Sequence, residues 1–484
     1  MFILGDFMGR YFGTDGFRGE YGRELTDAHA ELIGRFLGEF YGDGSRENQP
    51  TYNEKTEVIC GKKKSDKLKE DTAKKGARIL IGKDTRKSSD LLEVAVARGI
   101  RAAGGEAILL GVCTTPAVAF LVRELHADGA IMITASHNPW GDNGIKIFDS
   151  QGLKLDDETT GKIEDFIDEN LKLKAGNEGI AALNEKKPNE NFSVEKIRLY
   201  EEHLCSFGAD FSGMKIGLDC ANGAAFAIAP RAFCALGAEV FTIGTEPDGE
   251  NINRGLGSTN IAALMDFVKK NDLDLGFAFD GDGDRCITVN REGEVLDGDC
   301  EMLNLALDML SRGKLKAGKV ALTVMSNLGL VRELEKHGIG AEICPVGDRF
   351  VAEKMRELGL TLGGEQSGHI IIGDEVTGDG ILTAICLTKI AKERGFLQNF
   401  MPTPQISENV RVREKGWIMG DKRLEIALSE ARLELGDEGR ILLRPSGTEN
   451  LIRIMVEHQI PEKCKLIVSK IADLVRKIDK DGVL

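Results

Sequence analysis

The sequence has no pair of cysteines in a Cys-x-x-Cys arrangement, and its ten cysteines are scattered from Cys60 to Cys464. This scatter excludes a structural zinc site and a disulfide scaffold as the basis of the fold. No apolar run approaches the roughly 20 residues of a membrane-spanning helix. The apolar stretch at residues 2–4 is followed at once by Asp6, so a signal-peptide core is lacking as well. We therefore expect a cytoplasmic protein that has no membrane partner.

Excess positive charge and a nucleotide-binding loop are also lacking. The chain of 484 residues carries a net charge of −15, which argues against nucleic acid or an anionic membrane as the main partner. No GxxxxGK[ST] segment occurs, so the sequence has no Walker loop. An anionic ligand must therefore meet a local cluster of positive charge.

Short apolar runs alternate with segments of helical period, a pattern typical of α/β domains. Strands are predicted at 79–82, 107–110, 129–133, 215–219, 275–279 and 320–324, and helices at 91–103, 224–236, 261–268, 302–310 and 461–478. Breaks at 177–188, near 297 and at 401–405 divide the chain into four parts. We predict three consecutive α/β domains with mixed, mainly parallel sheets at 1–178, 179–297 and 298–403, and a smaller α+β domain at 404–484.

The segment 43–75 differs from the rest of the chain. It is dense in charges of both signs and contains few large apolar residues. Such a composition predicts a solvated insertion in the first domain, and docking of a partner is the alternative.

The apolar run at 129–133 leads into a turn that carries Ser136, His137 and Asn138. Pro139 and Gly141 prevent a helix from starting there, so we expect Ser136 to lie exposed at a strand end. A serine in this position is either a nucleophile or an ordinary hydrogen-bonding residue of a loop. The turn alone leaves both interpretations open.

Three carboxylates follow the strand predicted at 275–279. Asp280, Asp282 and Asp284 are separated by glycines, which let the backbone curl so that all three converge on one hard cation. A calcium EF-hand loop is excluded, because Arg285 and Arg291 stand where that loop needs Gly and Glu. Magnesium suits the remaining pattern, and a plain Asp-Gly turn is the alternative.

The loop 363–369 places Glu365, Gln366, Ser367 and His369 within five residues on a glycine-rich turn. Such a mixture of donors and acceptors suits a polyhydroxylated ligand. His369 is a candidate proton carrier, because the unperturbed pKa of a histidine side chain lies near neutrality. A surface turn with incidental polar residues is the alternative.

The loop 444–449 follows a strand-like segment and combines Arg444, Ser446, Gly447 and Thr448. A guanidinium, two hydroxyls and backbone amides form a reasonable phosphate cradle, with an arginine-capped turn as the alternative.

Further cations come from Arg18 in the glycine-rich loop 12–19, from Lys146 and from Arg349. Each of these, taken alone, has the pattern of an ordinary surface charge.

Five motifs occur in order along nearly the whole chain: FGTDGFRG (12–19), TASHNP (134–139) with NGIK (143–146), DGDGDR (280–285), GEQSGH (364–369) and RPSGTE (444–449). Together they resemble the α-D-phosphohexomutase family, whose fold has four domains around a central cleft. The segments TVMSNLGL, VGDRF and TGDGILTA are most similar to the branch that acts on glucosamine phosphates, and the mannose and glucose branches are the alternatives.

The resemblance implies a phosphotransferase that moves a phosphoryl group between the 6- and 1-hydroxyls of a hexose. It implies phosphoserine at Ser136, a sugar 1,6-bisphosphate intermediate, and one Mg²⁺ held by Ser136 and the three aspartates. Arg18 and either Lys146 or His369 would join Ser136 in catalysis, the lysine or histidine as the base. Substrate-binding roles would fall to Arg285, Arg349, Glu365, Ser367, Arg444, Ser446, Gly447 and Thr448.

The partner implied is a small sugar phosphate, and the protein is expected to be a monomer or homodimer. Two rivals of different class remain: a non-catalytic sugar-phosphate binder that kept the fold, and a metal-dependent phosphatase that uses the same serine.

Overall fold

The computed structural model describes residues 9–13, 15–42, 76–174, 190–446 and 449–482. The predicted insertion 43–75 and the predicted boundary 177–188 lie outside the described residues. Contacts divide the chain into two compact units. The N-terminal unit comprises Gly9–Val295 and Glu375–Lys389, and the C-terminal unit comprises Leu296–Asp374 and Ile390–Leu484. Within the described ranges, every helix is too short or too polar to span a membrane.

The N-terminal unit begins with an α/β block built on a mixed sheet. Its elements are β1 (Phe12–Gly13), β2 (Gly16–Glu20), α1 (Asp27–Gly42), β3 (Arg78–Lys83), α2 (Ser89–Ala102), β4 (Glu106–Val112), α3 (Thr115–Glu124), β5 (Gly129–Ile133), β6 (Asp142–Asp149) and α4 (Asp157–Lys174). The strand order is β1-β2-β6-β5-β3-β4. Strand β3 pairs in parallel with β4 and β5, whereas the pairs β5–β6, β6–β2 and β2–β1 are antiparallel.

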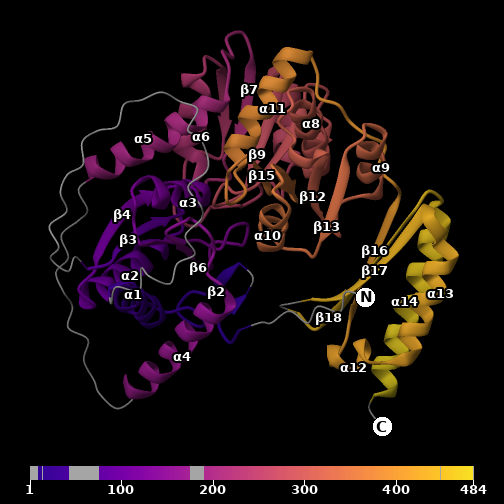
Figure 1. Cartoon of the computed structure of the whole chain (residues 1–484), viewed down its shortest axis with the longest axis horizontal. Helices are drawn as coiled ribbons and strands as arrows, with labels where there is room; N and C mark the ends of the chain where they lie inside the picture. The colour runs from indigo at the N-terminus through magenta and orange to yellow at the C-terminus, as the bar shows by residue number, and fades with distance from the viewer. Residues whose placement is uncertain (1–8, 14, 43–75, 175–189, 447–448, 483–484) are drawn as a thin grey trace. The chain divides into compact units, whose positions relative to one another are not determined.

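Alternation along the strands assigns the two faces of this sheet. Ile131 and Ile133 of β5 join one apolar core with residues of α1, α2 and α4. On the other face, a Cβ placed on Gly82 would lie 2.4 Å from Val118 in α3. The sheet is therefore covered by helices on both faces, with α1 and α2 side by side on one of them (Figure 1).

A second α/β block completes the N-terminal unit. It contains α5 (Glu190–Phe207), β7 (Lys215–Asp219), α6 (Ala225–Ala235), β8 (Glu239–Ile243), α7 (Ala262–Asn271), β9 (Leu275–Phe279), β10 (Cys286–Asn290) and residues 380–389 of α11 (Gly380–Arg394). Strand β11 (Val295–Leu296) lies at the boundary between the two units. The strand order is β11-β10-β9-β7-β8, with β7 parallel to β8 and β9, and β9 antiparallel to β10.

The C-terminal unit contains a third α/β block. Its elements are α8 (Gly298–Ser311), η2 (Lys316–Gly318), β12 (Lys319–Thr323), α9 (Leu328–Lys336), β13 (Gly340–Cys344), α10 (Asp348–Leu358), β14 (Leu362–Gly364) and β15 (Ile370–Ile372). The strand order is β13-β12-β14-β15, parallel except for the antiparallel pair β14–β15.

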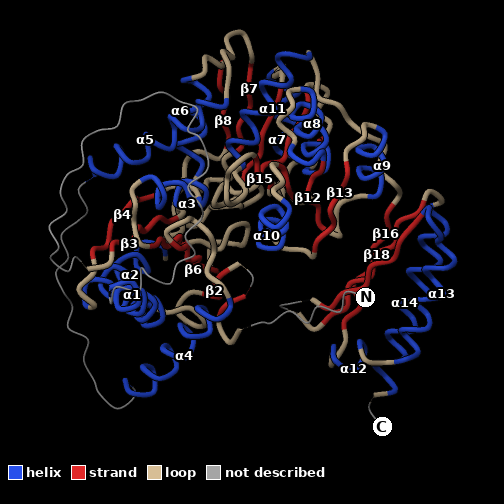
Figure 2. The backbone as a smooth tube through the Cα atoms, viewed as in Figure 1, coloured by secondary structure: helices blue, strands red, loops and turns tan. Residues whose placement is uncertain are grey.

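The last block has a three-stranded antiparallel sheet in the order β16-β18-β17. Its elements are β16 (Gln405–Arg411), α12 (Lys415–Met419), α13 (Lys422–Leu435), η3 (Gly436–Glu438), β17 (Gly439–Pro445), β18 (Leu451–His458) and α14 (Pro461–Asp481). Helices α13 and α14 lie side by side on one face of this sheet and enclose one apolar core with it (Figure 2).

A buried polar joint ties the last two blocks together at Asn327. Its Nδ2 donates to Thr403 O and to Glu457 Oε1, both at 3.1 Å, while its Oδ1 accepts from Thr403 N at 2.8 Å. Glu457 in turn pairs with Arg440, with Oε2 2.6 Å from Nε. The Asn327 side chain therefore pairs with both the N–H and the carbonyl group of Thr403, in the segment that joins the two blocks.

The predicted fold class is confirmed, because three α/β blocks with mixed sheets precede a smaller antiparallel-sheet block. Each predicted strand and helix agrees with an observed element to within a few residues, as Gly129–Ile133 shows for β5. Parallel pairing is confined to the middle and one side of each α/β sheet, and antiparallel strands complete the other side. The domain limits 1–178, 179–297, 298–403 and 404–484 stay predictions.

The crossing of α1 and α2 depends on two glycines. A Cβ on Gly99 would lie 1.9 Å from Glu31 O, and one on Gly34 would lie 2.2 Å from Val96 O. We expect Gly99→Ala to lower the free energy of unfolding by about 2 kcal/mol through overpacking. The control Gly161→Ala, in open space on α4, should raise it by about 0.5–1 kcal/mol through helix propensity. Urea unfolding of both variants is the measurement, and equal stability would contradict a tight crossing.

A buried carboxyl in α8 makes stability depend on pH. Asp299 is fully buried and accepts a hydrogen bond from Asn327 N at 2.7 Å, and burial raises its pKa to about 7. Because the folded pKa exceeds the unfolded value of about 3.9, the native state binds the extra proton and stability falls as pH rises from about 4 to 7. Asp299→Asn removes this ionisation. The wild type should therefore lose stability relative to Asp299→Asn as the pH rises, so the Tm of the variant minus the Tm of the wild type should increase from pH 5 to pH 8. A constant difference would refute the raised pKa of Asp299.

Candidate active site

Two loops leave the same edge of the first sheet because β3 and β5 are parallel. Lys83 is paired with Ile133, and Asp84 N donates to Ile133 O at 3.0 Å. The chain beyond β3 therefore runs beside residues 134–142, which we call the serine loop. This edge is where α/β sheets commonly place their ligands.

Ser136 lies in the serine loop, but the expectation that it is exposed is wrong. Only 1% of its surface is accessible, and its Oγ donates to Asp280 Oδ2 at 2.5 Å. The reason is tertiary, since Asp280 belongs to the second α/β block of the same unit and its loop covers the end of β5. His137 Nδ1 lies 3.4 Å from the same Oγ.

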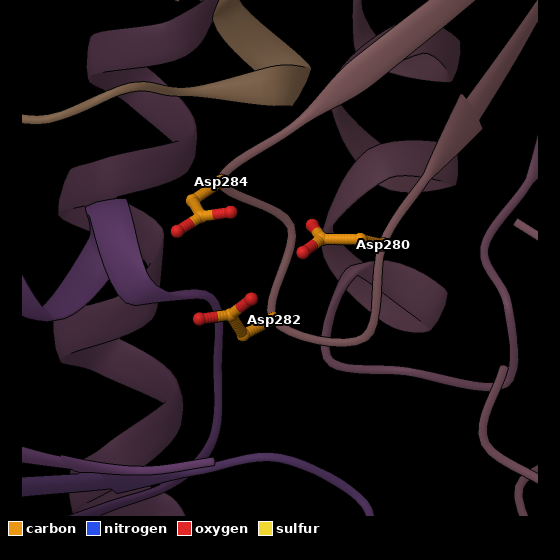
Figure 3. A group of neighbouring side chains, drawn as sticks. All are labelled: Asp280, Asp282 and Asp284. Carbon is orange, nitrogen blue, oxygen red and sulfur yellow. The ribbon is translucent and has the colours of Figure 1, made fainter. Parts of the chain in front are cut away.

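Asp280, Asp282 and Asp284 come from residues 280–285, which we call the aspartate loop, between β9 and β10. All three are buried, and one carboxylate oxygen from each lies within 4.8 Å of the others. Figure 3 shows the three carboxyl groups turned toward a common space. Burial, followed by the charges of Asp284 and Asp282, raises the pKa of Asp280 well above its usual range. The predicted convergence of these carboxylates is therefore present in the structure.

Lys146 reaches the aspartate loop from β6. Its neighbours Ile145 and Ile147 belong to the core shared with α1 and α2, so alternation directs Lys146 to the opposite face. Its Nζ lies 2.8 Å from Asp282 Oδ2 and 3.1 Å from Asp284 Oδ2. Although burial favours the neutral amine, Asp15, Asp282 and Asp284 hold the pKa of Lys146 well above its usual value. In this arrangement Lys146 is a counter-cation.

The glycine-rich loop 12–19 joins the same group of charges. Asp15 pairs with Arg18 and Lys154, and its Oδ1 lies 3.4 Å from Lys146 Nζ. Asp15 is half-buried, and although desolvation alone would raise its pKa, the cations Lys146, Lys154 and Arg18 lower that pKa well below its usual range. The Nε of Arg18 is buried and has no hydrogen-bond partner among the described residues. A donor thus remains for an anionic group.

His137 lies between Ser136 and Arg285. Arg285 Nη1 is 3.4 Å from His137 Nδ1, and Arg285 N donates to Asp280 Oδ1 at 3.2 Å. Burial, with the positive charges of Arg285 and Arg18, lowers the pKa of His137 to about 4. His137 is therefore neutral at physiological pH.

The donor set fits a hard divalent cation. It offers only carboxylate and hydroxyl oxygens, the ligands that Mg²⁺ prefers. Asp282 Oδ1 is buried and has no hydrogen-bond partner within the described ranges. The other oxygen, Oδ2, accepts from the hydroxyl of Thr115 at the start of α3, and Thr115 N donates to Asp282 O at 2.9 Å. Such supporting contacts orient metal ligands in proteins.

In the C-terminal unit the structure brings Glu365 and His369 beside the loop 346–349, where Arg349 Nε pairs with Glu353 Oε1 at 2.8 Å. Glu365 Oε1 accepts from Gly347 N at 3.1 Å, and Glu365 N donates to His369 O at 3.0 Å. Asp348 Oδ2 lies 3.9 Å from His369 Nε2. Ser367, in the same turn, is exposed. The loops 346–349 and 363–369 therefore form one polar cluster.

Arg444 and Ser446 lie at the end of β17 in the antiparallel block. Ser446 is buried, its Oγ accepts from Glu449 N at 3.3 Å, and its carbonyl accepts from Lys415 Nζ at 2.7 Å. Gly447 and Thr448 lie outside the described residues. Their role in a phosphate cradle stays a prediction.

Four buried residues around the serine and aspartate loops were missed by sequence reasoning: Asp84, Arg86, Thr115 and Asn253. A usable signal exists for the first two. They directly follow an apolar strand, as Ser136 does, and polar residues at the carboxyl ends of parallel strands gather at one edge. No local pattern marks Asn253, which is brought to the serine loop by folding alone.

Comparison with protein families gives four matches along the chain. All four carry the description phosphoglucomutase/phosphomannomutase. Its alpha/beta/alpha domains I, II and III match residues 37–174, 200–293 and 297–403, and its C-terminal domain matches residues 408–480.

Relatives named phosphoglucosamine mutase are similar over the full length. The protein of Geobacillus kaustophilus is 42% identical over 480 residues, and that of Caldicellulosiruptor saccharolyticus is 43% identical over 488 residues. Both alignments cover 97% of this chain and 99% of the relative.

Solved structures share the fold. A phosphoglucomutase/phosphomannomutase family protein from Burkholderia thailandensis has a TM-score of 0.74 at 23% identity, covering 98% of both chains. The N-acetylphosphoglucosamine mutase of Aspergillus fumigatus, solved with GlcNAc-6P and magnesium, has a TM-score of 0.57 at 16% identity, covering 75% of this chain and 92% of that one.

The aspartate loop predicts a divalent-cation site that can be measured without turnover. Calorimetric titration with Mg²⁺ should show one site per chain, and Asp282→Asn should weaken it by about 10- to 100-fold. Asp272→Asn is the matched control, because Asp272 is exposed, pairs with Arg291 and has the positive φ that Asn tolerates. Equal Mg²⁺ affinity in wild type and Asp282→Asn would rule out this cation site.

Proposed function

Because the chain belongs to the α-D-phosphohexomutase family, a family of intramolecular phosphotransferases, we propose that it reversibly converts glucosamine 6-phosphate to glucosamine 1-phosphate. The full-length relatives named phosphoglucosamine mutase support this choice of hexose. The contact that carries the proposal is the 2.5 Å hydrogen bond from Ser136 Oγ to Asp280. This bond lies between a buried hydroxyl and a carboxylate of the proposed cation site.

In this proposal Ser136 carries a phosphoryl group between turnovers. Mg²⁺, held by Asp280, Asp282, Asp284 and an oxygen of the phosphoserine, would neutralise charge on the phosphoryl group during transfer. Arg18 and Arg285 lie around the serine loop and supply guanidinium donors to the same oxygens. His137, which is neutral, would shape the serine loop without adding a charge to it.

The reaction then has two half-steps. In the first, the bond from phosphorus to Ser136 Oγ breaks as a bond forms to the 1-hydroxyl of glucosamine 6-phosphate, and the hydroxyl proton passes to a base. The product, glucosamine 1,6-bisphosphate, reorients. In the second, the 6-phosphoryl group returns to Ser136 Oγ, the 6-oxygen recovers a proton, and glucosamine 1-phosphate leaves. Phosphate is conserved throughout.

The base is Lys146 or His369. The ion pairs of Lys146 with Asp282 and Asp284 raise its pKa, so it must be released from them before it accepts a proton. Cation binding by these aspartates would weaken both pairs. His369, which is buried beside Asp348, is the alternative.

Substrate recognition is assigned to the C-terminal unit. Glu365 and Ser367 would bind sugar hydroxyls, and Arg349 would contribute a further contact to the substrate. The substrate phosphate that is not being transferred would bind to the segment Arg444, Ser446, Gly447 and Thr448. We place the enzyme in the cytoplasm, where its product would feed synthesis of UDP-N-acetylglucosamine and cell-wall precursors.

The test compares kcat/KM for the 6-phosphates of glucosamine, mannose and glucose. We expect the glucosamine value to exceed the other two by at least about tenfold, and Ser136→Ala to reduce turnover by about 1,000-fold or more. Ser407→Ala, on the exposed side of β16, is the matched control and should retain wild-type activity.

Three results separate the alternatives. A glucosamine value no greater than the others would reject the choice of hexose. Release of free phosphate in proportion to substrate loss would indicate a phosphatase. Full turnover by Ser136→Ala would remove Ser136 from the mechanism.

A further inference from the structure

The backbone at Ser136 is held in an unfavourable conformation. Its φ of 51° lies in the left-handed region, which non-glycine residues rarely adopt. Such a conformation persists only where the surroundings determine it, and it is common at functional sites. The contacts that impose it on Ser136 are therefore part of how the hydroxyl is aimed.

Arg86 supplies the first set of contacts. Its side chain is fully buried, and Nε pairs with Asp84 Oδ2 at 2.9 Å. The other two guanidinium nitrogens donate to carbonyl oxygens of the serine loop. Nη2 donates to Ser136 O at 2.9 Å and to Asn138 O at 2.8 Å, and Nη1 donates to Asp142 O at 3.0 Å and to Pro139 O. One guanidinium thereby holds the loop at four positions.

Asn253 supplies a second set from the other α/β block of the same unit. Its Nδ2 donates to Ser136 O at 2.9 Å and to Asn138 O at 3.1 Å. The carbonyl of Ser136 thus accepts from both Asn253 and Arg86, which occupies both of its lone pairs.

Asn253 also lies against the aspartate loop. A Cβ placed on Gly281 would be 2.4 Å from Ser136 O and 2.9 Å from Asn253 Nδ2. Asn253 N donates to Ala221 O at 2.8 Å, and Gly281 O accepts from Ala224 N at 2.8 Å. The amide is therefore packed where the serine loop meets the backbone between Asp280 and Asp282.

We propose that Asn253 is a positioning residue that, with Arg86, holds the carbonyl of Ser136 so that its Oγ keeps its place beside the aspartate loop during phosphoryl transfer. This rests on the proposed function. Phosphorylation removes the proton that Ser136 Oγ donates to Asp280 at 2.5 Å and attaches a group whose negative charge lies on its non-bridging oxygens. Until a cation neutralises that charge, the repulsion pushes the serine loop away from the carboxylates. The two donors on the Ser136 carbonyl resist that displacement.

The test uses Asn253→Gly in the full-length enzyme with saturating Mg²⁺. Glycine accommodates the φ of 60° at this position and removes the side chain that carries the amide. We expect kcat, and the single-turnover rate of transfer from phosphorylated Ser136, to fall by about 10- to 100-fold, because small misplacement of a reacting group has effects of this size. KM for the sugar phosphate should stay within about twofold.

Hydrogen exchange supplies a readout that does not depend on turnover. Amides of residues 134–142 should exchange at least about tenfold faster in Asn253→Gly, while the rest of the N-terminal unit is unchanged. Asn222→Gly is the matched control, since it also replaces an asparagine of positive φ, and its side chain accepts from Glu246 N instead of contacting the serine loop. Arg86→Lys, which keeps the charge beside Asp84, should lower kcat further.

Each outcome decides the proposal. Unchanged kcat, or faster exchange spread over the whole unit, would overturn it, and a loss confined to KM would move Asn253 to substrate binding instead. If wild-type enzyme interconverts no hexose phosphate, the proposed function fails and the role in transfer fails with it. The exchange pattern of residues 134–142 then separately decides whether Asn253 holds the loop.

Discussion

Three buried carboxylates within 4.8 Å of one another repel strongly, and the candidate site of the N-terminal unit is organised around that repulsion. Lys146 pairs with Asp282 and Asp284, and Ser136 donates a hydrogen bond to Asp280. The backbone N–H and the hydroxyl of Thr115 both donate to Asp282. A cation in the same space would take over the role of Lys146. Metal binding at this place would therefore be linked to the release of Lys146 from its ion pairs with Asp282 and Asp284.

The serine that faces these carboxylates is held mainly through its backbone. Arg86 and Asn253 contact its carbonyl oxygen, so the serine hydroxyl is left to donate to Asp280. Because the two holding residues come from different α/β blocks, the position of Ser136 relative to Asp280 depends on both blocks at once. Fixing a reactive group in advance in this way is what phosphoryl transfer requires of a protein.

Much of the candidate site was predictable because its parts lie on loops directly after apolar strands. Ser136 follows β5, the aspartates follow β9, and Glu365 follows β14. The burial of Ser136 was predicted wrongly, because a local pattern of turn residues contains no information on which other loop covers it. Asn253 and Thr115 were missed for the same reason: each acts on a residue more than 100 positions away in the chain.

The sequence by itself determined the order of strands and helices, the α/β class and the chemistry available in each loop, since these depend on the period of apolar residues and on local turn chemistry. Only the tertiary structure decided that Lys146 faces the carboxylates, that Ser136 is buried against Asp280, and that Arg86 and Asn253 converge on one carbonyl oxygen. Those contacts follow from strand pairing and from the packing of one block on another, which bring together residues that no spacing along the chain connects.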